Sequence, residues 1–375
     1  MSDIARTLLA GLLVAGLSTP VSARKPDIRG YQPQDATAAS ALPIYVVIEQ
    51  AELKPEIEYG YINVFGSSQP YQNMSMGQSA GVDLAGGLIA SAILNGAAYA
   101  KAKRFAQPPY HVIQQAKCNL SIESGLSEAV GTAVRGNWPT ASVHVSSLQP
   151  GQKLASLIDT DQPRYVFMVS SSLATDFSSV ITSIDSEAYL PQAAGAHAAR
   201  QPAWRDTVIV ASDQVAVATS KSQADIDAMV AAESARFVAL DLDDRILAVN
   251  AAGTNADRRE RNRLAALLLE HDHLLKDAAS DEWTPTGEAL RRAQLLSDHQ
   301  CDLLNASVRF SSTQAAQLVT ALGRGQLPAL SSSVQKTAES VPDGRQTLAL
   351  PGGIFVSQRT GDNVVLGYRS SLLAD

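Results

Sequence analysis

Two runs of β-branched and aromatic residues near the middle of the chain constrain its fold most strongly. Residues 164–170 read RYVFMVS and residues 178–184 read SSVITSI, with the polar residues Thr175 and Asp176 between them. Such runs are typical of β-strands, and a short polar connection between two of them favours a hairpin. We therefore expect these two segments to form an antiparallel strand pair.

Other segments with the same character extend the predicted sheet. A strand is expected over 43–50, where the sequence is PIYVVIEQ, and another over 141–146, where polar and apolar residues alternate. Two short runs at 207–210 and 215–217 are expected to join the same sheet. Near the end of the chain, 352–357 and 364–368 flank Gly361–Asp–Asn363, which predicts a terminal β-hairpin over 352–369.

The second half of the chain favours helices. Residues 255–279 place Leu264, Leu267, Leu268, His271, Leu274 and Leu275 at the spacing of one helical face. Pro285 is suited to the first turn of a further helix reaching about Leu304, and another is expected over 313–322, ending at Gly323. Shorter helices are expected at 121–134 and 154–158.

These patterns together predict an α+β fold. It has a mixed or antiparallel sheet, a buried helix of small residues, a helical C-terminal half and a terminal β-hairpin. The expected organisation is a signal peptide over 1–23, a flexible leader over 24–41, an α/β region over 42–220 and a mainly helical region over 221–375. The leader is polar and rich in small residues and proline, and it has no apolar period.

The first 23 residues have the pattern of a secretory signal peptide. Arg6 precedes the apolar run LLAGLLVAGL, and small residues then lead to a cleavage point between Ala23 and Arg24. The alternative, an uncleaved membrane anchor, is disfavoured because the run is shorter than the roughly 20 residues that a span needs. The chain is therefore expected to be exported to the periplasm, with association to the outer membrane left open.

Composition excludes several classes of function. The formal net charge is −7 and no large basic block occurs, so nucleic-acid binding is disfavoured. No phosphate-binding glycine loop, CxxC pair or HExxH motif is present, and no cofactor is expected. The chain has two cysteines, Cys118 and Cys301. In an exported protein they form either one disulfide or two separate thiols, and the sequence leaves both alternatives open.

Ser79 lies in GQSAG, which has the spacing of the nucleophile elbow of α/β-hydrolases. The elbow requires a strand directly before the serine, whereas the preceding residues 69–76 are polar and include a proline. A triad would need an acid such as Asp241 or Asp243 and a base such as His271 or His273. Since many aspartates are present, this assembly is weak support for a hydrolase.

The run after Ser79 is rich in small residues. Residues 81–104 are expected to form a helix in which Gly, Ala and Ser recur four apart, a spacing that allows close helix packing. This helix either packs within protein or associates with a membrane. A true span near 82–100 is the alternative, although Asp83 and Asn95 lie within it.

Histidines in EHDH at 270–273 invite a metal-site interpretation, with His271 and His273 as candidate ligands. Ligands on one helix usually lie three or four residues apart, and these lie two apart. His271 also falls on the apolar face, which favours a hydrogen-bonded core histidine. The arginine-rich run at 257–263 is expected to be a solvated face, and Trp138, Trp204 and Trp283 are expected to be packing residues.

In its layout the chain resembles uncharacterised envelope proteins of Gram-negative bacteria. The resemblance is carried by the signal-like start, GGLIASAILNGAAYAKAKRF, YVFMVSS with SSVITSI, and GGIFVSQRTGDNVVLGY. It implies a location and transfers no functional residue, and no lipidation cysteine is present. The expected function is a non-catalytic binding or accessory component of the envelope, whose partner is another envelope protein or a second copy. A serine hydrolase using Ser79 and a single-span membrane protein are the alternatives.

Overall fold

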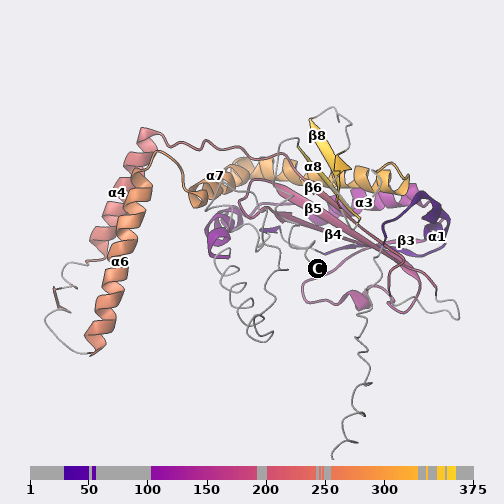
Figure 1. Cartoon of the computed structure of the whole chain (residues 1–375), viewed down its shortest axis with the longest axis horizontal. Helices are drawn as coiled ribbons and strands as arrows, with labels where there is room; N and C mark the ends of the chain where they lie inside the picture. Colours follow the sequence, from indigo (N-terminus) through magenta and orange to yellow (C-terminus); the bar gives the residue numbers. More distant parts are fainter. Residues whose placement is uncertain are drawn as a thin grey trace, which may run out of the picture.

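The structure is a computed structural model that describes residues 29–49, 53–55, 103–191, 201–241, 245, 247–248, 255–327, 335–336, 344–350 and 353–359. Within these residues the chain has an α+β fold built on one mixed sheet, as Figure 1 shows. Helices run along the sheet, and a pair of helices projects from one end of it. The α+β class and the helical C-terminal half that the sequence predicts are confirmed.

Nine strands of the described residues form the sheet, in the order β3-β1-β4-β5-β6-β9-β8-β7, with β2 paired to β4. Their bounds are β1 Ile44–Ile48, β2 Lys54–Pro55, β3 Val143–Ser147, β4 Arg164–Leu173, β5 Val180–Tyr189, β6 Trp204–Ala211, β7 Gln335–Lys336, β8 Arg345–Leu350 and β9 Ile354–Arg359.

The predicted antiparallel pair is the centre of this sheet. β4 and β5 pair antiparallel over ten residues, from Arg164 opposite Tyr189 to Leu173 opposite Val180. β6 is antiparallel to β5, whereas β3, β1 and β4 are parallel to one another and β9 is parallel to β6. The parallel pairs join strands that lie far apart in the sequence, so their pairing was not evident from local patterns.

Two of the described helices, α4 and α7, begin where a side chain caps the first turn. α4 Gln223–Ala239 follows Ser222, whose hydroxyl accepts a hydrogen bond from the backbone amide of Asp225. α7 Pro285–Ser297 follows Thr284 and has proline at its first position. The other helices are α1 Ala36–Ser40, α3 Ile122–Asn137, α6 Asn255–Ala279, α8 Asp302–Gly323 and residues 103–116, with 3-10 turns at Pro33–Asp35, Leu154–Ser156 and His299–Cys301.

The main core lies between the sheet and the helices α3 and α8. Alternate residues of β4, namely Tyr165, Phe167 and Val169, are fully buried there, as expected for one face of a strand. Trp138 and Trp204 both contact Tyr165 edge to face, with ring centroids 5.4 and 5.7 Å apart. Each aromatic side chain buried this way contributes about 2–3 kcal/mol through the area removed from water. Both tryptophans are packing residues, as predicted.

A disulfide joins Cys118 to Cys301, with the two Cα atoms 5.7 Å apart. It connects the chain just after the helix over 103–116 to the start of α8, 183 residues later. Of the two alternatives that the sequence left open, the structure has the disulfide.

Regular structure begins earlier than the sequence indicates. Residues 29–41, expected to be part of a flexible leader, include a 3-10 turn and α1, and Tyr31 and Ala39 are buried. The cause is an ion pair that has no signal in the local pattern: the Arg29 guanidinium binds the Asp35 carboxylate at 2.5 and 2.6 Å. This ion pair closes the turn that places Tyr31 in the core.

Three other boundaries differ from the prediction. Residues 215–217 are not a strand, because the Val215 amide donates to the carbonyl of Ser178 in the β4–β5 turn. The helix expected over 285–304 ends at Ser297, since His299, Gln300 and Cys301 take positive φ angles. α8 then continues unbroken to Gly323 because the Ser311 and Ser312 hydroxyls donate to the Val308 carbonyl and stay within the helix.

A terminal hairpin is present, but it joins β8 to β9, whereas the sequence predicts a pairing of 352–357 with 364–368. β9 pairs antiparallel with β8, which precedes it, and Gly353 provides a positive φ of 81° in the connection. The segment 364–368, the expected partner, lies outside the described residues. So do the signal peptide with Ala23 and Arg24, Ser79, and residues 81–102 of the small-residue helix with its possible span. Among the helices that are described, none combines the length and apolar character required to cross a membrane.

Candidate functional site

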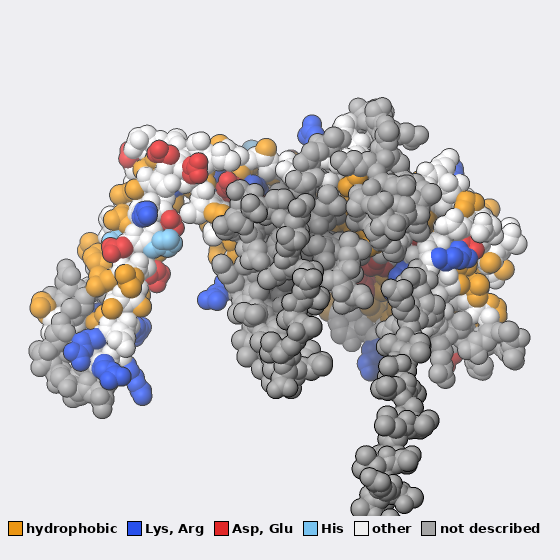
Figure 2. Space-filling model, viewed as in Figure 1, with side chains coloured by type: hydrophobic (Ala, Val, Ile, Leu, Met, Phe, Trp, Pro, Cys, Tyr) orange, Lys and Arg blue, Asp and Glu red, His pale blue; other side chains and the backbone are white. Residues whose placement is uncertain are grey.

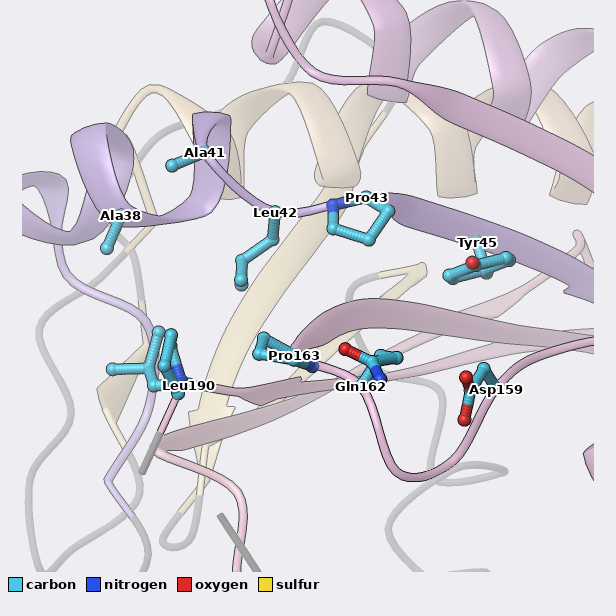
Figure 3. Close-up of a pocket in the computed structure, with 10 residues that line it drawn as sticks. Ala38, Ala41, Leu42, Pro43, Tyr45, Asp159, Gln162, Pro163 and Leu190 are labelled. Carbon is cyan, nitrogen blue, oxygen red and sulfur yellow. The ribbon is translucent and has the colours of Figure 1, made fainter. Parts of the chain in front are cut away.

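A pocket of about 630 Å³ opens where β1 and β4 begin (Figure 3). One wall is the end of α1 with the start of β1, and the other is formed by the segment before β4 and the end of β5. Its lining residues are Ala38, Ala41, Leu42, Pro43, Tyr45, Asp159, Gln162, Pro163, Leu190 and Pro191.

The lining of this pocket is suited to binding an apolar group. Leu42 and Leu190 face one another across it together with Pro43 and Pro163. Asp159 is its one carboxylate, and the lining residues include no serine, cysteine, histidine or lysine. The polar side chains among these lining residues are the Asp159 carboxylate, the Tyr45 hydroxyl and the Gln162 amide.

A buried carboxyl group lies elsewhere, on β6. Asp206 is 1% exposed, and its Oδ2 accepts a hydrogen bond from the backbone amide of Tyr31 at 2.9 Å. Burial raises its pKa from the ordinary value of 3.8 to about 7. Burial likewise raises the pKa of the Tyr165 hydroxyl. Because Asp206 is enclosed by the core, its evident role is to attach the N-terminal segment to β6.

The most distinctive feature is an arm formed by α4 and α6. The two helices lie side by side and project away from the sheet (Figure 1). At its base, Thr219 and Lys221 hydrogen-bond to the chain at 281–283, and the Lys221 ammonium, 8% exposed, donates to the carbonyls of Asp277, Ala278 and Ser280. These carbonyls end α6, where a cation is favoured. The base of the arm is thus closed by polar contacts.

His271 lies inside the arm, where it links the two helices. Its ring stacks on Phe237 of α4, and its Nδ1 is 2.8 Å from Glu233 Oε1. Arg236 binds the same Glu233 carboxylate through two bonds of 2.9 Å, and this contact, followed by the bond from His271, holds the pKa of Glu233 below its ordinary value. The prediction of a hydrogen-bonded core histidine is confirmed.

The structure does not bring His273 to His271. His273 is exposed, with Nε2 3.6 Å from Asp277. In the part of the chain that the structure describes, no three His, Cys, Asp or Glu side chains come together as a metal-binding group. His299 and Cys301 are at the start of α8, and Cys301 is in the disulfide.

The arginine-rich run occupies the outer end of the arm. Arg258, Arg259, Arg261 and Arg263 are exposed on the first turns of α6, as predicted for a solvated face. Glu260 among them binds Arg245 at 2.6 Å. Figure 2 shows blue side chains gathered at this end of the arm and red ones toward its base. Trp283, at the base, contacts Lys221 and Arg291 over its ring.

The sequence predicts α6 and a mainly helical region from residue 221, but not the pairing of α4 with α6. The available signal was the apolar face of α6, which needs a partner. Asp206 gave no local signal, since its burial depends on residues 175 positions away.

Comparison with known proteins adds no relative: no family model matches the chain, and no curated protein or solved structure is significantly similar to it.

Proposed function

We propose that the chain is an exported, non-catalytic component of the envelope of Gram-negative bacteria, which acts in the periplasm or at the outer membrane by binding another protein through the α4–α6 arm. The single observation that carries this proposal is the arm itself. Two helices alone bury little apolar surface, so a projecting helical pair is an element suited to contact with a partner.

Side-chain exposure on the arm supports this role. Val238 is 77% exposed, Leu269 71% and Leu274 36%. Of the apolar residues on the inner face of α6, Leu264 and Ala278 are buried, whereas Leu267, Leu268 and Leu275 are only half-buried. Large apolar side chains that are exposed on a projecting element are available for contact with a partner.

Two further observations support the location and the absence of catalysis. The signal-like sequence at 1–23 supports export, and the Cys118–Cys301 disulfide is consistent with an oxidising compartment. The described lining of the pocket in Figure 3 has one carboxylate and no serine, cysteine, histidine or lysine. Binding a partner protein does not require such groups.

Site-specific photo-crosslinking in intact cells tests the proposal. A photoreactive amino acid replaces Leu269 on the arm or, as the control, the exposed Gln149 in the loop after β3. We expect one defined protein adduct from position 269 and none from position 149. Equal, diffuse labelling at both positions would contradict the role of the arm.

A fluorophosphonate probe tests the hydrolase alternative on the same protein. We expect no covalent labelling of the purified wild type. Labelling that disappears in Ser79→Ala would overturn the non-catalytic assignment and establish Ser79 as a nucleophile.

A further inference from the structure

We propose that the pocket of Figure 3 binds a small organic cation, with the ammonium group of the ligand at Asp159 and its apolar body between Leu42 and Leu190. The volume of about 630 Å³ lies within the range of small-molecule sites, which is about 300–1,000 Å³. This inference does not depend on the arm, because other parts of the chain form the pocket.

The two ends of the pocket differ in polarity. Figure 3 shows aliphatic side chains at one end and polar side chains at the other, namely Leu42, Leu190 and Pro163 against Tyr45, Gln162 and Asp159. A ligand that fills both ends is amphipathic, because a polar group among the aliphatic side chains would lose its hydrogen bonds to water. The apolar body of the ligand therefore lies toward Leu190 and its polar group toward Asp159.

The polar end of the pocket is acidic. Asp159 is the one charged side chain among the lining residues. Its Oδ1 accepts the backbone amide of Asp161 at 2.9 Å, and no ion pair between described residues includes Asp159. A carboxylate has about four acceptor positions, so others remain for a ligand. An ammonium group complements this end, since it combines a positive charge with several N–H donors.

The arginine closest in sequence to Asp159 stabilises the loop and lies outside the pocket lining. Arg164 is 7% exposed and donates hydrogen bonds to the carbonyls of Thr160 and Gln162. Its guanidinium lies over the ring of Tyr189, 4.1 Å from the centroid. Arg164 therefore holds the loop that presents Asp159, while the lining itself contains no cation.

Contacts outside the pocket hold its walls in place. On one side, the ion pair between Arg29 and Asp35 closes the turn that leads into α1. On the other side, Ile158 is buried directly before Asp159. The ring of Tyr45 stacks on His144 of β3, with ring centroids 5.2 Å apart. Since the walls are already ordered, a small ligand loses little of its binding free energy to ordering them.

Ligand-observed NMR titration of the purified full chain tests the proposal with three probes that share one apolar body. The probes are phenylbutylammonium, the uncharged phenylbutanol and the anion phenylbutyrate. We expect a dissociation constant of about 0.1–1 mM for the ammonium, as is typical of a ligand of this size. The alcohol should bind about threefold to tenfold more weakly and the anion more weakly still, since only the ammonium complements Asp159.

Substitution of Asp159 tests the position of the ammonium group. Asp159→Asn removes the charge and keeps an oxygen that can accept the Asp161 amide, so the loop is retained. We expect its affinity for phenylbutylammonium to fall to that for phenylbutanol, and its affinity for phenylbutanol to match the wild type. Asp161→Asn is the matched control, because it makes the same change at an exposed side chain outside the lining, and it should leave both affinities unchanged.

Substitution of Leu190 tests the position of the apolar body. Leu190→Asn places a polar side chain in the half-buried aliphatic wall and is expected to weaken phenylbutylammonium and phenylbutanol alike by about fivefold or more. Leu295→Asn is the control, because it makes the same change on α7 at a side chain that is 42% exposed, and it should have no effect. Circular dichroism checks that all variants keep the fold.

Each contrary outcome has a defined meaning. Equal affinity of the wild type for the ammonium and the alcohol, or an equal effect of Asp159→Asn and Asp161→Asn, overturns the preference for a cation. Binding that is insensitive to Leu190→Asn overturns the location. Absence of saturable binding for all three probes overturns the site itself. None of these measurements involves the arm, so each of these failures is distinguishable from a failure of the proposed function.

Discussion

His271 Nδ1 on α6 lies 2.8 Å from Glu233 Oε1 on α4, and this contact joins the two helices of the arm near the middle of their length. The ring of His271 is covered by Phe237, and the carboxylate of Glu233 is also bound by Arg236. All four side chains belong to the arm. The arm therefore has a polar and aromatic centre of its own, separate from the core beneath the sheet.

Replacing His271 is expected to open the arm without unfolding the sheet. His271→Ala removes the stacking contact and leaves Glu233 with one partner fewer, a loss of about 1–3 kcal/mol in local stability. Hydrogen exchange should accelerate in peptides of α4 and α6 and remain unchanged in β4 and β5. His273→Ala is the control, since its side chain is 75% exposed. Equal acceleration in both variants would show that the contact with Glu233 is unimportant.

Metal removal is expected to leave the arm unchanged. His271 already uses Nδ1 for Glu233, and His273 points to a different side of α6. We expect the thermal midpoint and the exchange rates of the arm to be the same in EDTA and in excess Zn²⁺. A midpoint that rises with Zn²⁺ in the wild type but not in His273→Ala would restore the metal interpretation.

Asp206 is expected to make stability depend on pH. Because its pKa is raised by burial from 3.8 to about 7, the native state retains this proton over a range in which the unfolded chain loses it. Its contribution to the free energy of unfolding is complete below about pH 4 and is lost as the pH rises to about 7, with a slope of up to about 1.4 kcal/mol per pH unit.

Urea unfolding between these pH values measures that slope. In Asp206→Asn the slope should flatten, because an amide does not titrate, while its oxygen can still accept the Tyr31 amide hydrogen bond. Asp159→Asn, at an exposed carboxyl, should retain the slope of the wild type. Identical slopes in the wild type and Asp206→Asn would mean that Asp206 does not retain its proton.

Breaking the disulfide is expected to cost about 3–5 kcal/mol, because Cys118 and Cys301 close a loop of 183 residues in the unfolded chain. The double variant Cys118→Ser/Cys301→Ser should show this loss in urea unfolding. Reductant should have the same effect on the wild type and none on the double variant. A wild type whose unfolding is insensitive to reductant would show that the bridge does not stabilise the fold.

Export is expected to remove residues 1–23. Protein recovered from the periplasm of a Gram-negative host should begin at Arg24, as determined by N-terminal sequencing. Ala23→Arg places a large charged residue directly before the cleavage point and should cause the uncleaved form to accumulate. Recovery of the uncleaved wild type from the membrane fraction would instead support an anchor.

Local patterns were sufficient for most of the elements. The alternation and β-branched content of 164–184 predicted β4 and β5, and the bounds of α6 agree with the apolar period read from Leu264 onward. Such features depend on residues close in sequence, where side-chain periodicity reflects the geometry of the element directly. The same local pattern predicts that His271 is a buried, hydrogen-bonded residue, although it does not identify the partners of His271.

Pairings between distant segments were not accessible in this way. The parallel neighbours of β1 and β6, the burial of Asp206 by Tyr31, and the choice of a disulfide over two thiols all depend on contacts across tens to hundreds of residues. Local patterns do not predict the early start of structure at Arg29 for the same reason, because the ion pair of Arg29 with Asp35 stabilises the turn only when Tyr31 is buried in the core.

Composition and period were therefore enough to predict most element types, the α+β class and the amphipathic character of α6. The projection of α4 and α6 from the sheet as an arm is evident only in the folded chain. That outcome depends on which apolar faces find partners within the chain, and the free energy of burying a face is defined only when the partner is in place.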